Sequence, residues 1–252
     1  MTLLAVERIK LFSTRSPWWC MALAVALTVG MSALIAANTN DEFPLSVGLS
    51  QSFSNFGMIV IMVMAALAVT TEYRFGTIRA TFLAVPGRIQ ALLAKTVVVA
   101  VLAGVVGEVV AFGSWGISKL IKPNADLAIN SSVEWRNVAG TGLVFALSAV
   151  LAVAVGTLVR QTAGAVAILL VYALLVESLI GLIPKIGVKI QEWMPFMHAN
   201  NFLTADNAPL PEGAGPPRLD FPFGPWGSLA YFAAISIGLL VVALAVAKKR
   251  DA

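Results

Sequence analysis

The chain has 252 residues, of which 59% are apolar and only 12% are charged, and its mean hydropathy is +0.87. Typical soluble domains are about 25% charged, so this composition indicates a membrane protein. One helical span needs about 20 residues, so the length holds several spans and excludes a sizeable soluble domain such as an ATPase. We read the basic pI of about 9.4 as a topology signal rather than as nucleic-acid binding. The single cysteine, Cys20, excludes an internal disulfide or a cysteine metal cluster.

The N-terminal segment, residues 1–15, predicts a short helix that lies on the membrane surface. Ala5, Val6, Ile9 and Phe12 share one helical face in it, whereas Leu4 and Leu11 fall among the charged residues. The first long apolar run follows at residues 18–37. With about 20 residues it exceeds the apolar core of a signal peptide, which predicts a retained transmembrane helix.

Five more apolar runs predict spans at residues 52–71, 96–117, 138–159, 162–183 and 226–247. The link Arg160-Gln161 between two of them is so short that these helices must be antiparallel neighbours. We therefore expect an all-α polytopic membrane protein with six transmembrane helices, built as a single transmembrane domain over residues 1–252.

The distribution of basic residues predicts the orientation, because cytosolic loops carry the excess of Lys and Arg. The side that holds both termini has about eleven cations and three anions, Glu7, Glu72 and Asp251. The opposite side has about six cations and eight anions. Both termini are therefore predicted to be cytosolic, in a multi-pass protein of the plasma (inner) membrane.

Two of the connections between the spans contain residue patterns that indicate short helices rather than simple linkers. The cytosolic one, residues 72–90, is punctuated by Gly76 and by Pro86-Gly87, which leaves a short helix from Thr77 to Ala84 outside the membrane. A helix of this size has no core of its own, so we expect it to rest on another structure. The extracytosolic one, residues 184–225, predicts an interfacial helix before Pro195, a second short helix over residues 196–203, and a proline-rich stretch.

Two carboxylates lie inside the predicted spans, Glu108 in the third and Glu177 in the fifth. A charge at the bilayer centre costs at least about 2.5–3.5 kcal/mol, so both should face the protein interior, be protonated or reach water. Small residues flank each of them at a spacing of four, which favours buried helix contacts. Either residue serves a translocation path or proton site, or forms a structural hydrogen bond between helices; for Glu108 the structural role is favoured.

Motifs for catalysis are missing from the sequence. It has no P-loop, no H-E-x-x-H and no G-x-S-x-G, and His198 is the only histidine, so no histidine pair exists to bind a metal. We therefore expect no enzyme active site, no metal site and no cofactor in this chain.

The layout resembles the permease subunits of type 2 ABC exporters. The resemblance covers essentially the whole chain, and its most specific part is the stretch Glu72-Tyr73-Arg74-x-Gly76-Thr77-Ile78-Arg79. Pro86 and Arg88 before Lys95, Arg160-Gln161-Thr162-Ala163-x-Ala165, Glu177 and Trp193-x-Pro195 add to it.

The resemblance implies a specific role for several segments of the chain. Residues 1–15 would form the elbow helix, and residues 72–90 would contain the coupling helix that contacts a cytosolic P-loop ATPase. Glu72, Tyr73, Arg74, Gly76, Thr77 and Arg79 would be the ATPase-coupling residues. ATP and Mg²⁺ would be bound by the partner ATPase, and a second permease subunit, identical or paralogous, would complete a path lined by the first, second and fifth spans.

Other functions stay open at this stage. A proton- or ion-coupled secondary transporter would use Glu108 and Glu177 and needs no coupling helix, although no repeated halves are apparent. An intramembrane enzyme and a noncatalytic assembly or immunity subunit are further alternatives. Asn55, with Glu108 and Glu177, is among the isolated polar points in the spans, which suit an amphipathic drug or lipid but do not identify a substrate.

Overall fold

The computed structural model describes residues 2–40, 44–84, 87–205 and 219–249. Every regular element in these ranges is a helix, and six helices are long and apolar enough to cross a membrane. They are α2 (Arg15–Asn38), α3 with α4 (Val47–Ser50 and Ser54–Arg74), α6 (Arg88–Ile121), α7 (Ser132–Val159), α8 to α9 (Thr162–Val171 to Glu177–Ile180) and α12 (Pro225–Lys249). The prediction of an all-α fold with six membrane-spanning helices is confirmed.

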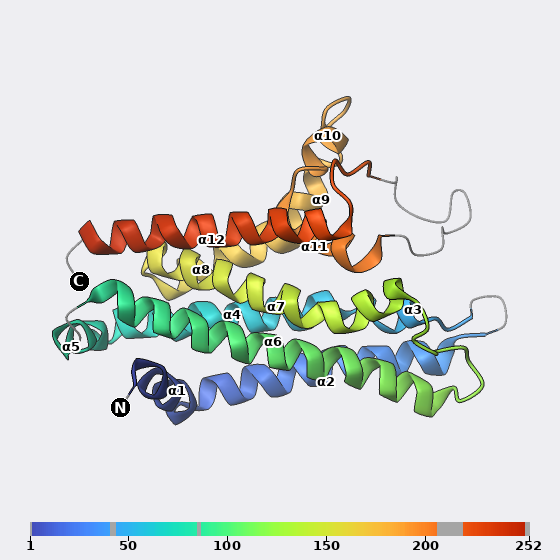
Figure 1. Cartoon of the computed structure of the whole chain (residues 1–252), viewed down its shortest axis with the longest axis horizontal. Coiled ribbons are helices and arrows are strands. Elements are labelled where there is room, and N and C mark those ends of the chain that lie inside the picture. The colour runs from blue at the N-terminus through green and yellow to red at the C-terminus, as the bar shows by residue number, and fades with distance from the viewer. Residues whose placement is uncertain (1, 41–43, 85–86, 206–218, 250–252) are drawn as a thin grey trace.

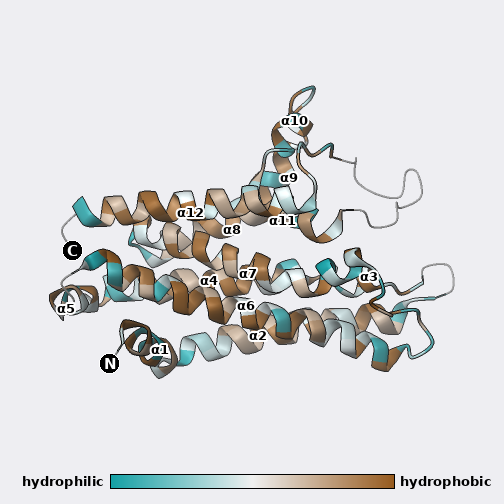
Figure 2. Ribbon diagram, viewed as in Figure 1, coloured by the Kyte–Doolittle hydropathy of each residue, from teal (hydrophilic) through white to brown (hydrophobic). Residues whose placement is uncertain are grey.

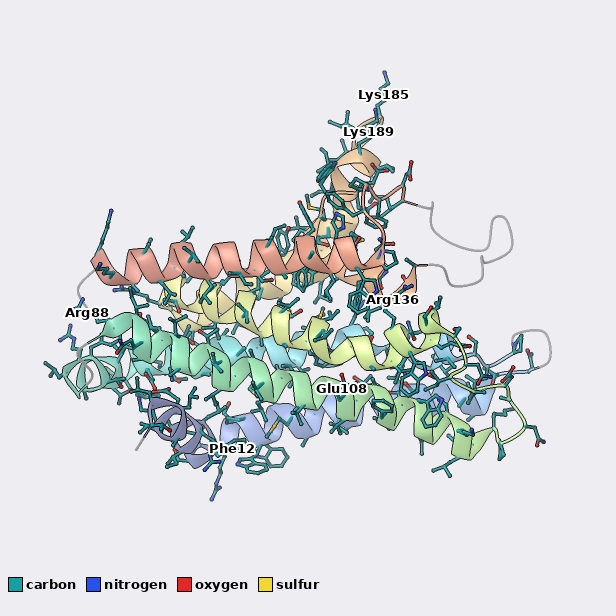
Figure 3. The ribbon with its side chains drawn as sticks, in the orientation of Figure 1. Phe12, Arg88, Glu108, Arg136, Lys185 and Lys189 are labelled. Atoms are coloured by element: carbon teal, nitrogen blue, oxygen red, sulfur yellow. The ribbon has the colours of Figure 1, made fainter. Side chains whose placement is uncertain are left out.

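Four shorter helices complete the described chain: α1 (Leu3–Ser13), α5 (Thr77–Ala84), α10 (Gly187–Gln191) and α11 (Pro195–Thr204). In Figure 1, α1, α5 and the end of α12 lie at one end of the bundle, which we call the α5 end. The segment α9–α10 projects sideways near the opposite end, with Lys185 and Lys189 at its tip (Figure 3). Pro86, Asp251 and most of the proline-rich stretch lie outside the described residues.

Several helices extend beyond the apolar runs that predict them. Helix α6 begins at Arg88 rather than residue 96, and α7 begins at Ser132 rather than residue 138. A capping box explains the second start, since Ser131 accepts the Glu134 N–H and the Glu134 carboxylate accepts the Ser131 N–H. Hydropathy marks the part of a helix inside hydrocarbon, whereas caps and polar first turns decide where the helix begins.

The fifth span is irregular. A π-helical segment, Tyr172–Val176, separates α8 from α9, and the helix ends at Ile180 instead of reaching residue 183. Apolar periodicity does not distinguish a π-helical turn from an α-helical one, so the sequence pattern gives no sign of this interruption.

Helices α4 and α7 form the centre of the bundle. Within the apolar part of α7, 61% of the residues are buried, and within the apolar part of α3–α4 the share is 56%. The corresponding share for α8–α9 is 17%. Ile61 and Met62 from α4, Phe145 from α7 and Phe232 from α12 are fully buried in one core cluster. Figure 2 shows long apolar stretches along the spans, as expected for helices whose outer faces meet lipid.

Helices α6 and α7 cross closely because glycines meet at the crossing. A Cβ placed on Gly107 would lie 2.9 Å from the Cα of Gly142 and 2.8 Å from Phe145 Cγ. Gly104 likewise faces the carbonyl oxygen of Gly142. Small residues are the usual means of bringing helix backbones together in membranes, where lipid competes with ordinary apolar contacts.

This crossing predicts that Gly107→Ala destabilises the bundle. The added methyl group must push α7 away, an overpacking change that typically costs about 1–3 kcal/mol. Gly116→Ala on the same helix is the matched control, because nothing lies within 4 Å of a Cβ there; there the better helix propensity of alanine should make the change neutral or stabilising. Thermal unfolding in detergent micelles measures both, and equal midpoints for the two variants would contradict the close crossing.

Candidate functional site

Four charged side chains meet at the α5 end, where α1, α4 and α6 converge. The Lys95 ammonium lies 2.5 Å from Glu7 Oε2 and 2.9 Å from Glu72 Oε1. The Lys10 ammonium lies 2.9 Å from Glu7 Oε1 and 3.4 Å from Glu72 Oε1. Each carboxylate therefore contacts both ammonium groups, and the charges sum to zero. We call these four residues the charge network.

Helix α5 is attached to the charge network through Lys10, whose ammonium donates a hydrogen bond of 2.8 Å to Thr81 Oγ1. Three members are largely buried: the side chains of Glu7, Lys95 and Glu72 are 4%, 7% and 12% exposed, against 34% for Lys10. Burying charges is costly unless they are paired, so the four residues hold their helices in one arrangement.

Lys10 lies outside the spans, and its pKa is shifted by two opposing effects. Partial burial lowers the pKa of the ammonium, but its hydrogen bonds and charge interactions with Glu7 and Glu72 outweigh burial, and the pKa rises above its usual value of 10.5. A raised pKa stabilises the fold at every pH below the unfolded-state value, and this contribution is lost only as the pH rises through the folded-state pKa. Lys10 therefore stays charged at neutral pH.

The sequence pattern identifies Glu72 but not its partners. In the sequence, Glu7 lies on the charged face of the surface helix and Lys95 counts only as one of the cytosolic cations, yet both side chains are buried. Lys95 lies well inside α6 because this helix begins at Arg88. The sequence does contain a weak sign of the network. Of the three anions on the side of the termini, Glu7 and Glu72 each have basic residues near them in the chain, and both belong to the network.

The network predicts that Lys95→Met is strongly destabilising, since it leaves the Glu7 and Glu72 carboxylates sharing only Lys10. Removing one partner of a buried ion pair costs about 3–5 kcal/mol. The control Lys119→Met, on the exposed end of α6, removes only a contact with the Trp115 ring and should cost under about 1 kcal/mol. Unfolding midpoints in detergent measure both.

A double variant provides a second check of the network. Adding Glu7→Gln to Lys95→Met removes one of the two orphaned carboxylates, so part of the lost stability should return. If the costs of the two substitutions simply add, Glu7 and Lys95 are not coupled and the network is wrong.

The turn between α4 and α5 requires a glycine. Gly76 has φ +70°, in the left-handed region that L-residues with side chains rarely occupy. It directs α5 across the end of the bundle, where Ile78 is 3% exposed in a cluster with Val69 and Leu92. Ile78 is thus the apolar anchor of α5.

The other residues that the family resemblance assigns to ATPase coupling lie around this anchor. Arg74, Thr77 and Arg79 are exposed. Tyr73 is half-buried, with the Arg160 guanidinium 5.0 Å from its ring centre. The structure therefore brings Glu72 into the interior and leaves the three exposed residues on the surface of the α5 end.

Two large apolar side chains are also exposed there. Phe75 is 71% exposed and Leu83 is 88% exposed. Both lie in or next to α5, beyond the last turn of the span α4. The surface formed by Arg74, Phe75, Thr77, Arg79 and Leu83, which we call the α5 surface, combines apolar and cationic groups.

Glu177 lies near the opposite end of the bundle and is 1% exposed. Its two carboxylate oxygens accept the backbone N–H groups of Phe196 at 3.0 Å and Met197 at 2.9 Å. These are orphan donors in the first turn of α11, so Glu177 caps that helix from a distant part of the chain. Gln191 adds a 3.0 Å hydrogen bond from its amide to the Glu177 carbonyl oxygen.

Helix α11 is held on its other sides by α7 and α12. The Asn137 amide donates to the Leu203 carbonyl oxygen at 3.0 Å. The buried ring of His198 contacts Ser228 Oγ through Nδ1 at 3.1 Å, and the Asn201 amide donates to the same oxygen at 2.9 Å. His198 thus has a structural partner, and the described residues contain no group of three or more metal-ligating side chains.

The cap predicts a difference between two substitutions of Glu177. Glu177→Leu leaves the buried N–H group of Phe196 and the partly buried N–H group of Met197 without an acceptor, which costs about 1–3 kcal/mol. Glu177→Gln retains an acceptor oxygen and should lose less. Hydrogen exchange of the Phe196 and Met197 amides should accelerate in the leucine variant and change little in the glutamine variant. Equal protection in both would argue against the cap.

The candidate residues of the translocation path lie in three separate places. Glu108 is half-buried near the middle of the bundle's length (Figure 3), with its carboxyl group against Gly142 of α7, where no side chain would fit. Asn55 is exposed and lines a small cavity of about 230 Å³ with Gln51, Asn137 and Asn200. Glu177 lies under α11. The structure does not bring these three side chains into one site.

Comparison with known proteins leaves the family undetermined. No protein-family model matches this chain, and no curated protein sequence matches it either.

Proposed function

We propose that this chain is the membrane-spanning permease subunit of an ATP-driven ABC exporter. In this proposal a second permease subunit completes the translocation path, and separate cytosolic P-loop ATPases bind ATP and Mg²⁺. The proposal rests on the sequence resemblance together with the geometry of the α5 end. It places both termini and α5 in the cytosol and the protein in the plasma (inner) membrane.

The observation that carries the proposal is the construction of α5. This helix of eight residues lies across the end of the bundle, anchored inward by Ile78 and turned outward through the α5 surface. Phe75 and Leu83 expose apolar area beyond the last turn of the span α4, and exposed apolar area is typical of a protein interface. Arg74 and Arg79 beside it suit acidic groups on a partner.

The charge network supplies the link that coupling requires. A partner that moves α5 also displaces Thr81, and with it Lys10 and the carboxylates of Glu7 and Glu72. Lys95 carries the displacement into α6. Breaking the buried pairs is costly, so α1, α4, α5 and α6 are expected to move as one unit.

The second permease subunit has a candidate contact surface on α8–α9, one of the least buried spans. Exposed apolar side chains recur there every three or four residues, at Ile168, Val171, Leu175 and Leu179. Such a stripe is compatible with lipid as well, and the family resemblance is what assigns it to the permease pair.

The alternative, a proton- or ion-coupled carrier, requires Glu108 and Glu177 to titrate during transport. Glu177 is engaged by two backbone N–H groups of α11, whereas Glu108 lies against Gly142 of α7, so the two carboxyl groups have different partners in different parts of the bundle. This separation favours the ATP-driven proposal.

Copurification tests the proposal. The tagged chain is expressed with its neighbouring genes, isolated in detergent and assayed for a bound P-loop ATPase. Arg79→Ala should weaken retention of the ATPase about tenfold, which corresponds to about 1.4 kcal/mol. Lys249→Ala is the matched control, because it removes an exposed cation at the same end of the bundle but outside α5.

Three outcomes would count against the proposal. The chain could purify without any ATPase and still transport a solute when a proton gradient supplies the driving force, which would support the carrier. Lys249→Ala could weaken the complex as much as Arg79→Ala, in which case net charge rather than the α5 surface would bind the partner. A Glu72→Gln variant that leaves hydrolysis and transport fully coupled would remove the role of the charge network.

A further inference from the structure

A large cavity lies at the α5 end, beside the charge network. It has a volume of about 790 Å³ and is lined by α1, the start of α2, the last turns of α4, the first half of α6, and α5. One end is polar, with Lys10, Thr14, Arg15 and Thr77, and the other is apolar, with Met64, Leu67, Ala68 and Val98. A cavity with this division fits an amphiphile.

The length of the cavity matches one leaflet of a bilayer. Its lining on α4 runs from Phe75 at the end of the helix inward to Met64. At 1.5 Å per residue this distance is about 16 Å, close to half of a hydrocarbon core of roughly 30 Å. The polar end takes up part of this length, so the apolar part beside Met64, Leu67 and Ala68 accommodates a segment of an acyl chain that enters from the leaflet at the α5 end.

The polar end offers positive charge to a headgroup. Glu7 and Glu72 are 4% and 12% exposed and are engaged by the two lysines, whereas Lys10 is 34% exposed and Arg15 is exposed. The accessible charge is thus cationic although the network itself is neutral. The N-terminus of α2 adds to it, because its N-cap Thr14 makes no side-chain hydrogen bond to the helix.

We propose that this cavity binds one anionic phospholipid from the leaflet at the α5 end. A segment of an acyl chain occupies the apolar part between α4 and α6, and the phosphate contacts Arg15, while the Lys10 ammonium adds positive charge nearby from its place in the charge network. This lipid fills the space between the surface helix α1 and the spans, and so stabilises the helices that carry the charge network. The inference requires only that the chain spans a membrane and is independent of the proposed function.

Native mass spectrometry of the full chain in detergent tests this site, with phosphatidylglycerol and phosphatidylcholine of identical acyl chains as probes. The wild type should retain one phosphatidylglycerol, with phosphatidylcholine binding at least about fivefold more weakly, as expected for a charge-assisted headgroup contact. Ala68→Trp, which fills the cavity, should abolish this binding. Val101→Trp, on the exposed face of α6 outside the cavity, should retain it.

Arg15→Gln provides a variant that does not depend on packing, because Arg15 is exposed. It should reduce the preference for phosphatidylglycerol to less than about twofold. The proposal is overturned if Ala68→Trp and Val101→Trp retain the same amount of lipid, the pattern of annular binding. It is equally overturned if Arg15→Gln leaves the preference unchanged, and this arm decides the question where Ala68→Trp fails to fold.

Discussion

The burial of Lys95 is the constraint on which the α5 end of the molecule depends. An ammonium group inside an apolar helix is stable only if carboxylates reach it, and the two that do so come from α1 and α4. Helix α1 must therefore pack against the spans through Glu7 and Leu11, both buried, while Ile9 on its predicted apolar face is 52% exposed. The surface helix is positioned by charge pairing first, and its apolar face is left for the membrane.

The same physical principle operates at the other end with a different partner. Glu177 is more deeply buried than any residue of the charge network, but backbone N–H groups of α11 take the place of lysines. In both cases a buried ionisable side chain in a span attaches a short helix that has no core of its own. Ionisable residues are few in the described spans, and Lys95 and Glu177 are used where a short element must be fixed to a long one.

The sequence predicts the long elements well and their attachments poorly. The six apolar runs and the helix from Thr77 to Ala84 follow from local composition and from the glycine and proline residues that bound them, and both can be read directly from the sequence. The pairing of Glu7 with Lys95 joins residues 88 positions apart, and neither residue type nor spacing specifies it. Glu177 reads as an isolated acid because its partners are backbone groups, which every residue except proline offers. The π-helical segment is missed because its side chains keep an apolar pattern.

Packing connects the two ends of the bundle. Lys95 ties α1 and α4 to α6, the glycines at Gly107 and Gly142 press α6 against α7, and Asn137 of α7 binds the end of α11. Because helices that meet through glycine backbones have little room to slide independently, a shift of α6 must be shared by α7 or must open the crossing. If the proposed permease is driven from the α5 end, this series of contacts is a route by which displacement reaches the opposite side. Glu108 lies at the α6–α7 contact, against Gly142, so a separation of these two helices would change the surroundings of its carboxyl group.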